Sequence, residues 1–108
     1  MESRLFVAQR LSALVLAPLV IVHLGVILYA VRGGLSADEI LARTAGSVGW
    51  ATFYGLFVLA AAVHAPIGMR NVLREWTPWR GHSLDAAMLL LALALLATGL
   101  RAVWAVIA

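Results

Sequence analysis

The sequence has no cysteine and no lysine, and only 12% of its 108 residues are charged. The absence of cysteine excludes disulfide bonds, thiol catalysis, thiolate metal sites and iron–sulfur ligation by this chain. All 8 basic residues are arginines and they are scattered, so no basic stripe points to nucleic acid. Any cofactor would therefore be held by histidine, methionine, arginine or backbone groups.

Hydrophobic residues, by contrast, make up 64% of the chain. Soluble globular domains contain about half apolar and about a quarter charged residues. A single small domain cannot hide so many apolar side chains behind so few charges, because small folds leave much of their surface exposed. The composition therefore predicts a membrane protein.

Three apolar runs are long enough to cross a membrane, since a helix of about twenty residues spans the hydrocarbon core. The predicted spans cover about residues 11–31, 47–72 and 86–107, with Arg101 snorkelling near the end of the third. No linker suggests a second domain, so residues 1–108 are interpreted as a single transmembrane domain. We expect an all-α fold, an integral membrane bundle of three transmembrane helices.

The two connections between the spans differ in composition. Residues 32–43 contain two glycines, which end a helix, and Ser36 followed three residues later by Glu39, the spacing of a capping box. We expect a short interfacial helix there. Residues 74–82 hold two tryptophans beside proline and glycine, a composition typical of an interfacial loop. Because this loop is short, the second and third spans should be antiparallel neighbours.

Arginines in the flanks of the spans predict orientation, because cytoplasmic loops of membrane proteins carry an excess of basic residues. More arginines flank the membrane side that holds the N-terminus than the opposite side. We therefore expect a cytoplasmic N-terminus in a bacterial inner (cytoplasmic) membrane. The first group is Arg4, Arg10, Arg70, Arg74 and Arg80, and the second is Arg32, Arg43 and Arg101.

Two histidines, His23 and His64, fall inside predicted spans, where an ionisable side chain is costly and requires a partner or a function. Counted along the helices, His23 lies about 20 Å beyond Arg10, whereas His64 lies about 9 Å before Arg70. The histidines therefore occupy different levels, and one metal ion between them is not expected. Haem b fits His64, with the iron on its imidazole and the propionates on Arg10 and Arg70. The alternatives are a structural histidine and arginines that only anchor the interface.

A family pattern is carried by the segment His64-Ala-Pro-Ile-Gly68-Met-Arg70-Asn-Val-Leu-Arg-Glu75. The segment resembles the haem-ligand segment of the membrane-anchor subunits of succinate dehydrogenase and fumarate reductase. That pattern is histidine, three residues, glycine, an apolar residue, arginine, and an acid eleven residues after the histidine. A second motif, Gln9-Arg10-Leu-Ser12-Ala, is similar to the His-Arg-x-Ser/Thr-Gly that opens the family's first membrane helix.

Three positions depart from the family pattern. Asn71 stands where a propionate-binding histidine is common, Gln9 replaces the histidine before the arginine, and Phe6 occupies the position of the quinone-contacting serine. Because of these changes, the propionate and quinone contacts of this chain are expected to differ from those of the family pattern. Haem ligation by His64 is compatible with all of them.

The resemblance implies a haem b-binding membrane anchor of a succinate:quinone oxidoreductase of the tricarboxylic acid cycle. Such an anchor helps transfer electrons between an iron–sulfur subunit and ubiquinone or menaquinone, and has no catalytic residue of its own. The implied partners are iron–sulfur and flavoprotein subunits, with a second haem ligand from another anchor subunit or a second copy of this chain. The quinone head group would lie near Arg10, Ser12, Glu75 and Trp76.

The residues also leave other interpretations open. His23 has no place in the single-haem pattern and could bond within the bundle, contact another subunit or ligate a second haem, while His82 is expected to be solvated. The chain could instead anchor another haem b dehydrogenase, such as a hydrogenase or formate dehydrogenase, or have lost haem. A small dimeric transporter is disfavoured, because proton-coupled carriers usually need a carboxylate in the membrane and no Asp or Glu falls within the spans.

Overall fold

The structure, a computed structural model, describes residues 2–108, which form four helices and no strand. The helices are α1 (Glu2–Gly33), α2 (Ala37–Thr44), α3 (Val48–Trp76) and α4 (His82–Ile107). Three of them, α1, α3 and α4, are long and apolar enough to cross a membrane. The expected all-α membrane fold, with a short helix between the first two spans, is confirmed.

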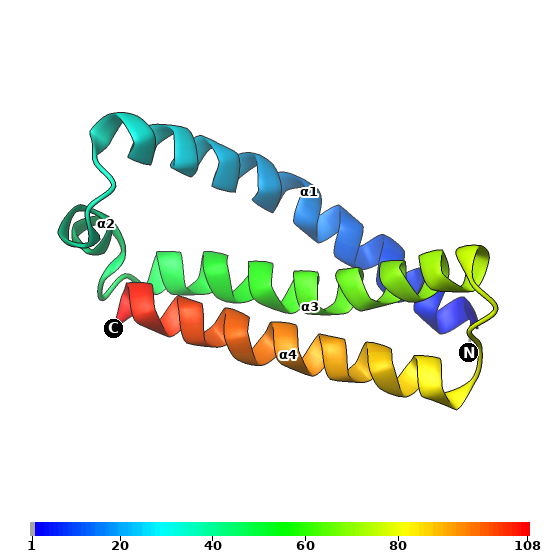
Figure 1. Ribbon diagram of the computed structural model, residues 1–108. Coiled ribbons are helices and arrows are strands. Elements are labelled where there is room, and N and C mark those ends of the chain that lie inside the picture. Colours follow the sequence, from blue (N-terminus) through cyan, green and yellow to red (C-terminus); the bar gives the residue numbers. More distant parts are fainter. Residues whose placement is uncertain (1) are drawn as a thin grey trace.

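The central helix of the bundle is α3, against which both α1 and α4 pack (Figure 1). The short connection 77–81 makes α4 the antiparallel neighbour of α3, as expected. The N-terminal part of α1 crosses α3, and the rest of α1 diverges from α3 as it approaches α2 (Figure 1). The N-terminal end of α1 and the α3–α4 connection therefore lie at one end of the molecule, and α2 and the C-terminus at the other.

Local capping explains where the helices begin. Ser36 accepts a hydrogen bond from the backbone N–H of Glu39 at 3.2 Å and donates one to its Oε1 at 2.7 Å, so the predicted start of α2 is present. Ser47 starts α3 in the same way, accepting from the Trp50 N–H at 3.1 Å. All three long helices extend beyond the predicted spans, because turns in the headgroup region keep their backbone bonds while charged side chains reach water.

The C-terminal end of α4 is capped by the last residue of α2 and by the connection between α2 and α3. The Thr44 hydroxyl donates to the Val106 carbonyl, and the Gly46 backbone N–H donates to the Ile107 carbonyl at 2.8 Å. Gly46 has a φ of 71°, a conformation that glycine adopts without strain. The last carbonyls of a helix have no partner within it, so this loop satisfies two groups that α4 leaves unpaired.

Close helix packing depends on small residues. Ala60 and Ala62 of α3 are buried, and a Cβ at Gly99 of α4 would lie only 2.6 Å from Cγ1 of Val58. Leu84, 1% exposed, is the one large side chain fully buried in the described part of the chain. Most large apolar side chains instead face outward, where lipid or a partner helix would cover them.

Candidate functional site

His64 meets Ser12 where α1 crosses α3. Ser12 is buried, with 7% of its surface exposed, and His64 is half-buried. The Ser12 hydroxyl donates to the Gln9 carbonyl at 3.0 Å and lies 3.4 Å from Nδ1 of His64. This contact places His64 level with the first turns of α1.

Gly68, one turn beyond His64, lies against the same part of α1. A Cβ at Gly68 would sit 3.4 Å from Nε2 of Gln9, so the glycine allows the two helices to approach. The other amide atom of this side chain, Gln9 Oε1, is buried and has no hydrogen-bond partner within residues 2–108. An unpaired buried acceptor is costly and therefore marks a place where an additional donor would be favourable.

An apolar groove runs between α1 and α3 beside this contact. Its volume is about 330 Å³, and Ser12 is the one residue with a polar side chain among those that line it. A flat apolar surface beside a histidine suits a planar ligand that is largely apolar. The lining residues are Ala8, Leu11, Ser12, Val15, Leu56, Leu59, Ala60 and Val63.

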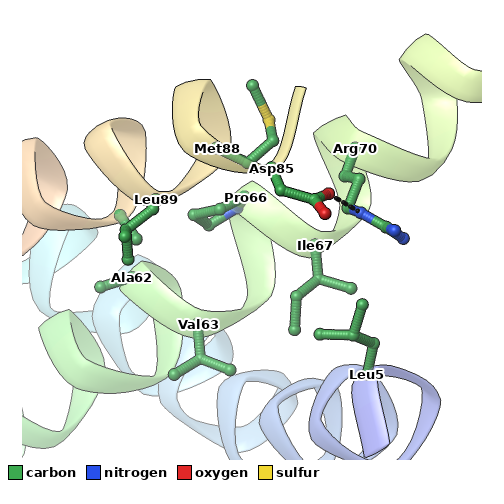
Figure 2. A pocket seen from close by; sticks show the side chains of 10 residues that line it. Leu5, Ala62, Val63, Pro66, Ile67, Arg70, Asp85, Met88 and Leu89 are labelled. Atoms are coloured by element: carbon green, nitrogen blue, oxygen red, sulfur yellow. Dashed lines mark hydrogen bonds and ion pairs between the residues drawn. The ribbon is translucent and has the colours of Figure 1, made fainter. Parts of the chain in front are cut away.

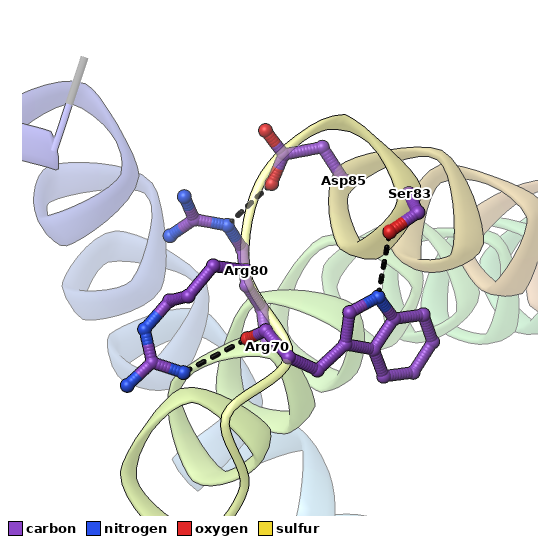
Figure 3. Close-up of polar contacts among 5 residues, drawn as sticks. Arg70, Arg80, Ser83 and Asp85 are labelled. Atoms are coloured by element: carbon purple, nitrogen blue, oxygen red, sulfur yellow. Dashed lines mark hydrogen bonds and ion pairs between the residues drawn. The ribbon is translucent and has the colours of Figure 1, made fainter.

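Arg70 pairs with Asp85, a partner that the sequence reasoning missed. Arg70 Nε donates to Asp85 Oδ1 at 2.8 Å, which links the final turns of α3 to the first turn of α4 (Figure 3). The sequence could have indicated this pair, because two antiparallel helices joined at residues 77–81 bring positions near 70 and 85 to the same level. Trp79 Nε1 donates to Ser83 Oγ at 2.8 Å, and Arg80 donates to the carbonyls of Thr77 and Trp79 in the loop.

A second cavity, of about 420 Å³, lies between α1, α3 and α4 (Figure 2). It is apolar except at the end where Arg70 and Asp85 meet, and His64 does not line it. His64 does not line the groove between α1 and α3 either, and Val63 lines both hollows. It is lined by Leu5, Ala62, Val63, Pro66, Ile67, Arg70, Asp85, Met88, Leu89 and Ala92.

His23 lies in the other half of the bundle, within an aromatic cluster. Its ring makes edge contacts with Tyr54, at 5.9 Å between centroids, and with Phe57, at 5.2 Å. Its Nδ1 is buried and has no hydrogen-bond partner in the described residues. Since Ser12 marks the level of His64, the histidines are about 16 Å apart along α1, which confirms that they occupy different levels.

The residues predicted to contact quinone fall into two groups. Arg10 is exposed on α1, with its Cζ 5.8 Å from the Phe6 ring centroid. Glu75 and Trp76 are exposed in the last turn of α3, about 14 Å farther along the bundle than Arg10. Glu75 lines a polar cleft of about 340 Å³ together with Asn71, Arg74 and Arg80. Ser12 is buried beneath His64 and belongs to neither group, and His82 is exposed, as expected.

The comparison with protein families agrees with this arrangement. Residues 1–100 match the family described as succinate dehydrogenase/fumarate reductase transmembrane subunit. No curated protein and no solved structure matches the chain. The match includes α1, α2, α3 and most of α4, and so contains both motifs and the contact between them. The chain therefore belongs to the family of succinate dehydrogenase/fumarate reductase transmembrane subunits.

Proposed function

We propose that this membrane-anchor subunit binds haem b through His64 and helps transfer electrons between an iron–sulfur subunit and quinone. The observation that carries the proposal is the half-buried imidazole of His64, held between α1 and α3 beside an apolar groove. Imidazole is a common axial ligand of haem iron. Family membership adds the context of a succinate dehydrogenase or fumarate reductase complex.

The residues around His64 fit such a group. Gly68 presents no side chain one turn away, and the groove beside the Ser12–His64 contact is apolar. No group of three His, Cys, Asp or Glu side chains in residues 2–108 is placed to hold a bare metal ion. Haem iron needs one or two protein ligands, and a second anchor subunit or a second copy of this chain would supply the other.

Arg10 and Arg70 are the proposed partners of the haem propionates. Both arginines lie closer than His64 to the end of the bundle that holds the N-terminus. Arg70 is about 9 Å from His64 along α3. Guanidinium groups bind carboxylates in a planar, two-pronged geometry. Asp85 would then hold Arg70 in place from its other side.

The quinone, ubiquinone or menaquinone, would bind at the same membrane surface. Because Arg10 and the last turn of α3 lie far apart along the bundle, they would not hold one head group together. The Trp76 indole N–H would donate a hydrogen bond to a quinone carbonyl and the Glu75 carboxyl group would exchange protons with it, while Arg10 would serve the haem propionate. When bound, haem b supplies a one-electron store close to this surface. Ser12 is buried and bonded to Gln9, so we assign it to His64 and not to quinone.

The proposed partners are iron–sulfur and flavoprotein subunits at the N-terminal end of the bundle. All five arginines of the larger group belong to the membrane side that holds the N-terminus, which favours a cytoplasmic N-terminus in a bacterial inner membrane. The large outward-facing apolar side chains are available to a second anchor chain as well as to lipid. No observation in the structure favours the transporter alternative or an anchor for a different dehydrogenase.

The test is to purify the detergent-solubilised complex through a tag on this chain, identify the accompanying subunits and add succinate. The proposal predicts flavoprotein and iron–sulfur subunits and a b-type α-band that succinate reduces. If the same subunits co-purify but no haem absorbance is found, the chain is a haem-free anchor. If hydrogenase or formate dehydrogenase subunits co-purify, the chain anchors that dehydrogenase instead. If no subunit co-purifies and no haem is found, the transporter interpretation is favoured.

A further inference from the structure

We infer that Ser12 positions His64 for iron ligation by fixing which of its ring nitrogens carries the proton. The inference rests on the proposed haem function of His64. It adds a residue from a second helix that acts on the ligand without touching the iron.

The hydrogen bonds of Ser12 determine the direction of the contact. A serine hydroxyl has one proton, and Ser12 donates it to the Gln9 carbonyl at 3.0 Å. With that proton engaged, the hydroxyl oxygen is left to accept from Nδ1 of His64, 3.4 Å away. We assign the ring proton to Nδ1 on this basis, which leaves the lone pair on Nε2, the atom that would bind iron.

The setting makes this assignment strong. Ser12 is 7% exposed, so bulk water has little access to compete for the hydroxyl. Ser12 belongs to α1 and His64 to α3, so the contact between the two helices holds the imidazole ring in one orientation. A hydrogen bond from the distal ring N–H to an oxygen raises the basicity of the ligating nitrogen. A more basic ligand stabilises ferric over ferrous iron, which lowers the midpoint potential of the haem.

The experiment is a redox titration of the haem α-band in the complex isolated through this chain. Ser12→Ala should shift the midpoint potential to more positive values. The expected change is about tenfold in the ferric-to-ferrous preference, or about 59 mV. Ser12→Thr, which keeps the hydroxyl, should titrate like the wild type. Thr98→Ala is the matched control, because Thr98 donates to a carbonyl of its own helix at 2.7 Å on an exposed face of α4.

Failure of this inference and failure of the haem proposal give different results. If His64→Ala keeps the α-band, the proposed ligand is wrong. If His64→Ala loses the band but Ser12→Ala titrates at the wild-type potential, the ligand stands and the role of Ser12 is refuted. If the Ser12→Ala variant loses haem, the Ser12→Thr variant distinguishes the two cases. Full haem content at the wild-type potential in Ser12→Thr supports the inference, and loss of haem in Ser12→Thr as well contradicts it.

Discussion

Arg70 and Asp85 form an ion pair that joins the end of α3 to the start of α4, with 2.8 Å between Nε and Oδ1. The arginine side chain is 13% exposed and the aspartate side chain 43%, so solvent screens the pair only in part. Asp85 also lies in the first turn of α4, where the helix dipole favours a negative charge. The pair thus fixes the position of an arginine that we assign to a haem propionate.

Removing the charge of Asp85 should destabilise the bundle modestly. Asp85→Asn is expected to lower the melting temperature slightly, because a partly exposed ion pair contributes little to stability. Thermal unfolding of the detergent-purified protein would measure it. In a cycle with Arg70→Gln, the double variant should lose less stability than the sum of the two single losses. Strict additivity would mean that the pair contributes nothing.

The contact between Gly99 and Val58 should tolerate no added methyl group. Gly99→Ala would place a carbon 2.6 Å from Val58 Cγ1, so α3 and α4 must separate, at a cost of about 1–3 kcal/mol. Gly55→Ala is the control, because a Cβ there meets no atom within 4 Å. Melting temperatures of both variants check this, and adding Val58→Ala should restore much of the loss at Gly99. Equal melting temperatures for the two alanine variants would contradict the close approach.

The cap on α4 predicts a local effect at the C-terminus. Thr44→Val removes the donor to the Val106 carbonyl and should cost about 1 kcal/mol. Thr52→Val is a fair comparison, because this exposed hydroxyl bonds only within its own helix. Hydrogen exchange in the last turn of α4 should become faster in the Thr44 variant alone. Unchanged exchange there would show that the loop does not hold the end of α4.

The aromatic setting of His23 predicts that this residue is dispensable for haem. His23→Phe keeps a ring against Tyr54 and Phe57 and removes a buried nitrogen that has no partner within residues 2–108. We expect full haem content and a stability equal to wild type or higher by up to about 1 kcal/mol. Haem quantified per chain gives the answer. A loss of haem, with His64 intact, would instead assign His23 to a second haem.

Much of the fold was predictable from the sequence, because apolar runs of membrane length and the Ser36–Glu39 cap depend on local chemistry. Counting residues along the helices also separated the level of His64 from that of His23. The helix ends were not predictable from charge, since arginines at the membrane surface do not interrupt a helix.

What the sequence did not reveal depends on packing between helices. The Arg70–Asp85 pair requires the register of α3 against α4. The closure of α4 by Thr44 requires knowing that α2 folds back onto the C-terminal end. That Nδ1 of His23 is buried without a hydrogen-bond partner in residues 2–108 depends on the packing of α1 against α3, which no local pattern encodes.

The central claim, that His64 ligates haem b, is tested most directly by dithionite-reduced minus oxidised spectra of the isolated complex. His64→Ala should abolish or strongly diminish the b-type α-band while the other subunits still co-purify. His82→Ala is the matched control, because His82 is exposed at the start of α4, and it should keep the band in full. A band of wild-type intensity in the His64 variant would contradict the account.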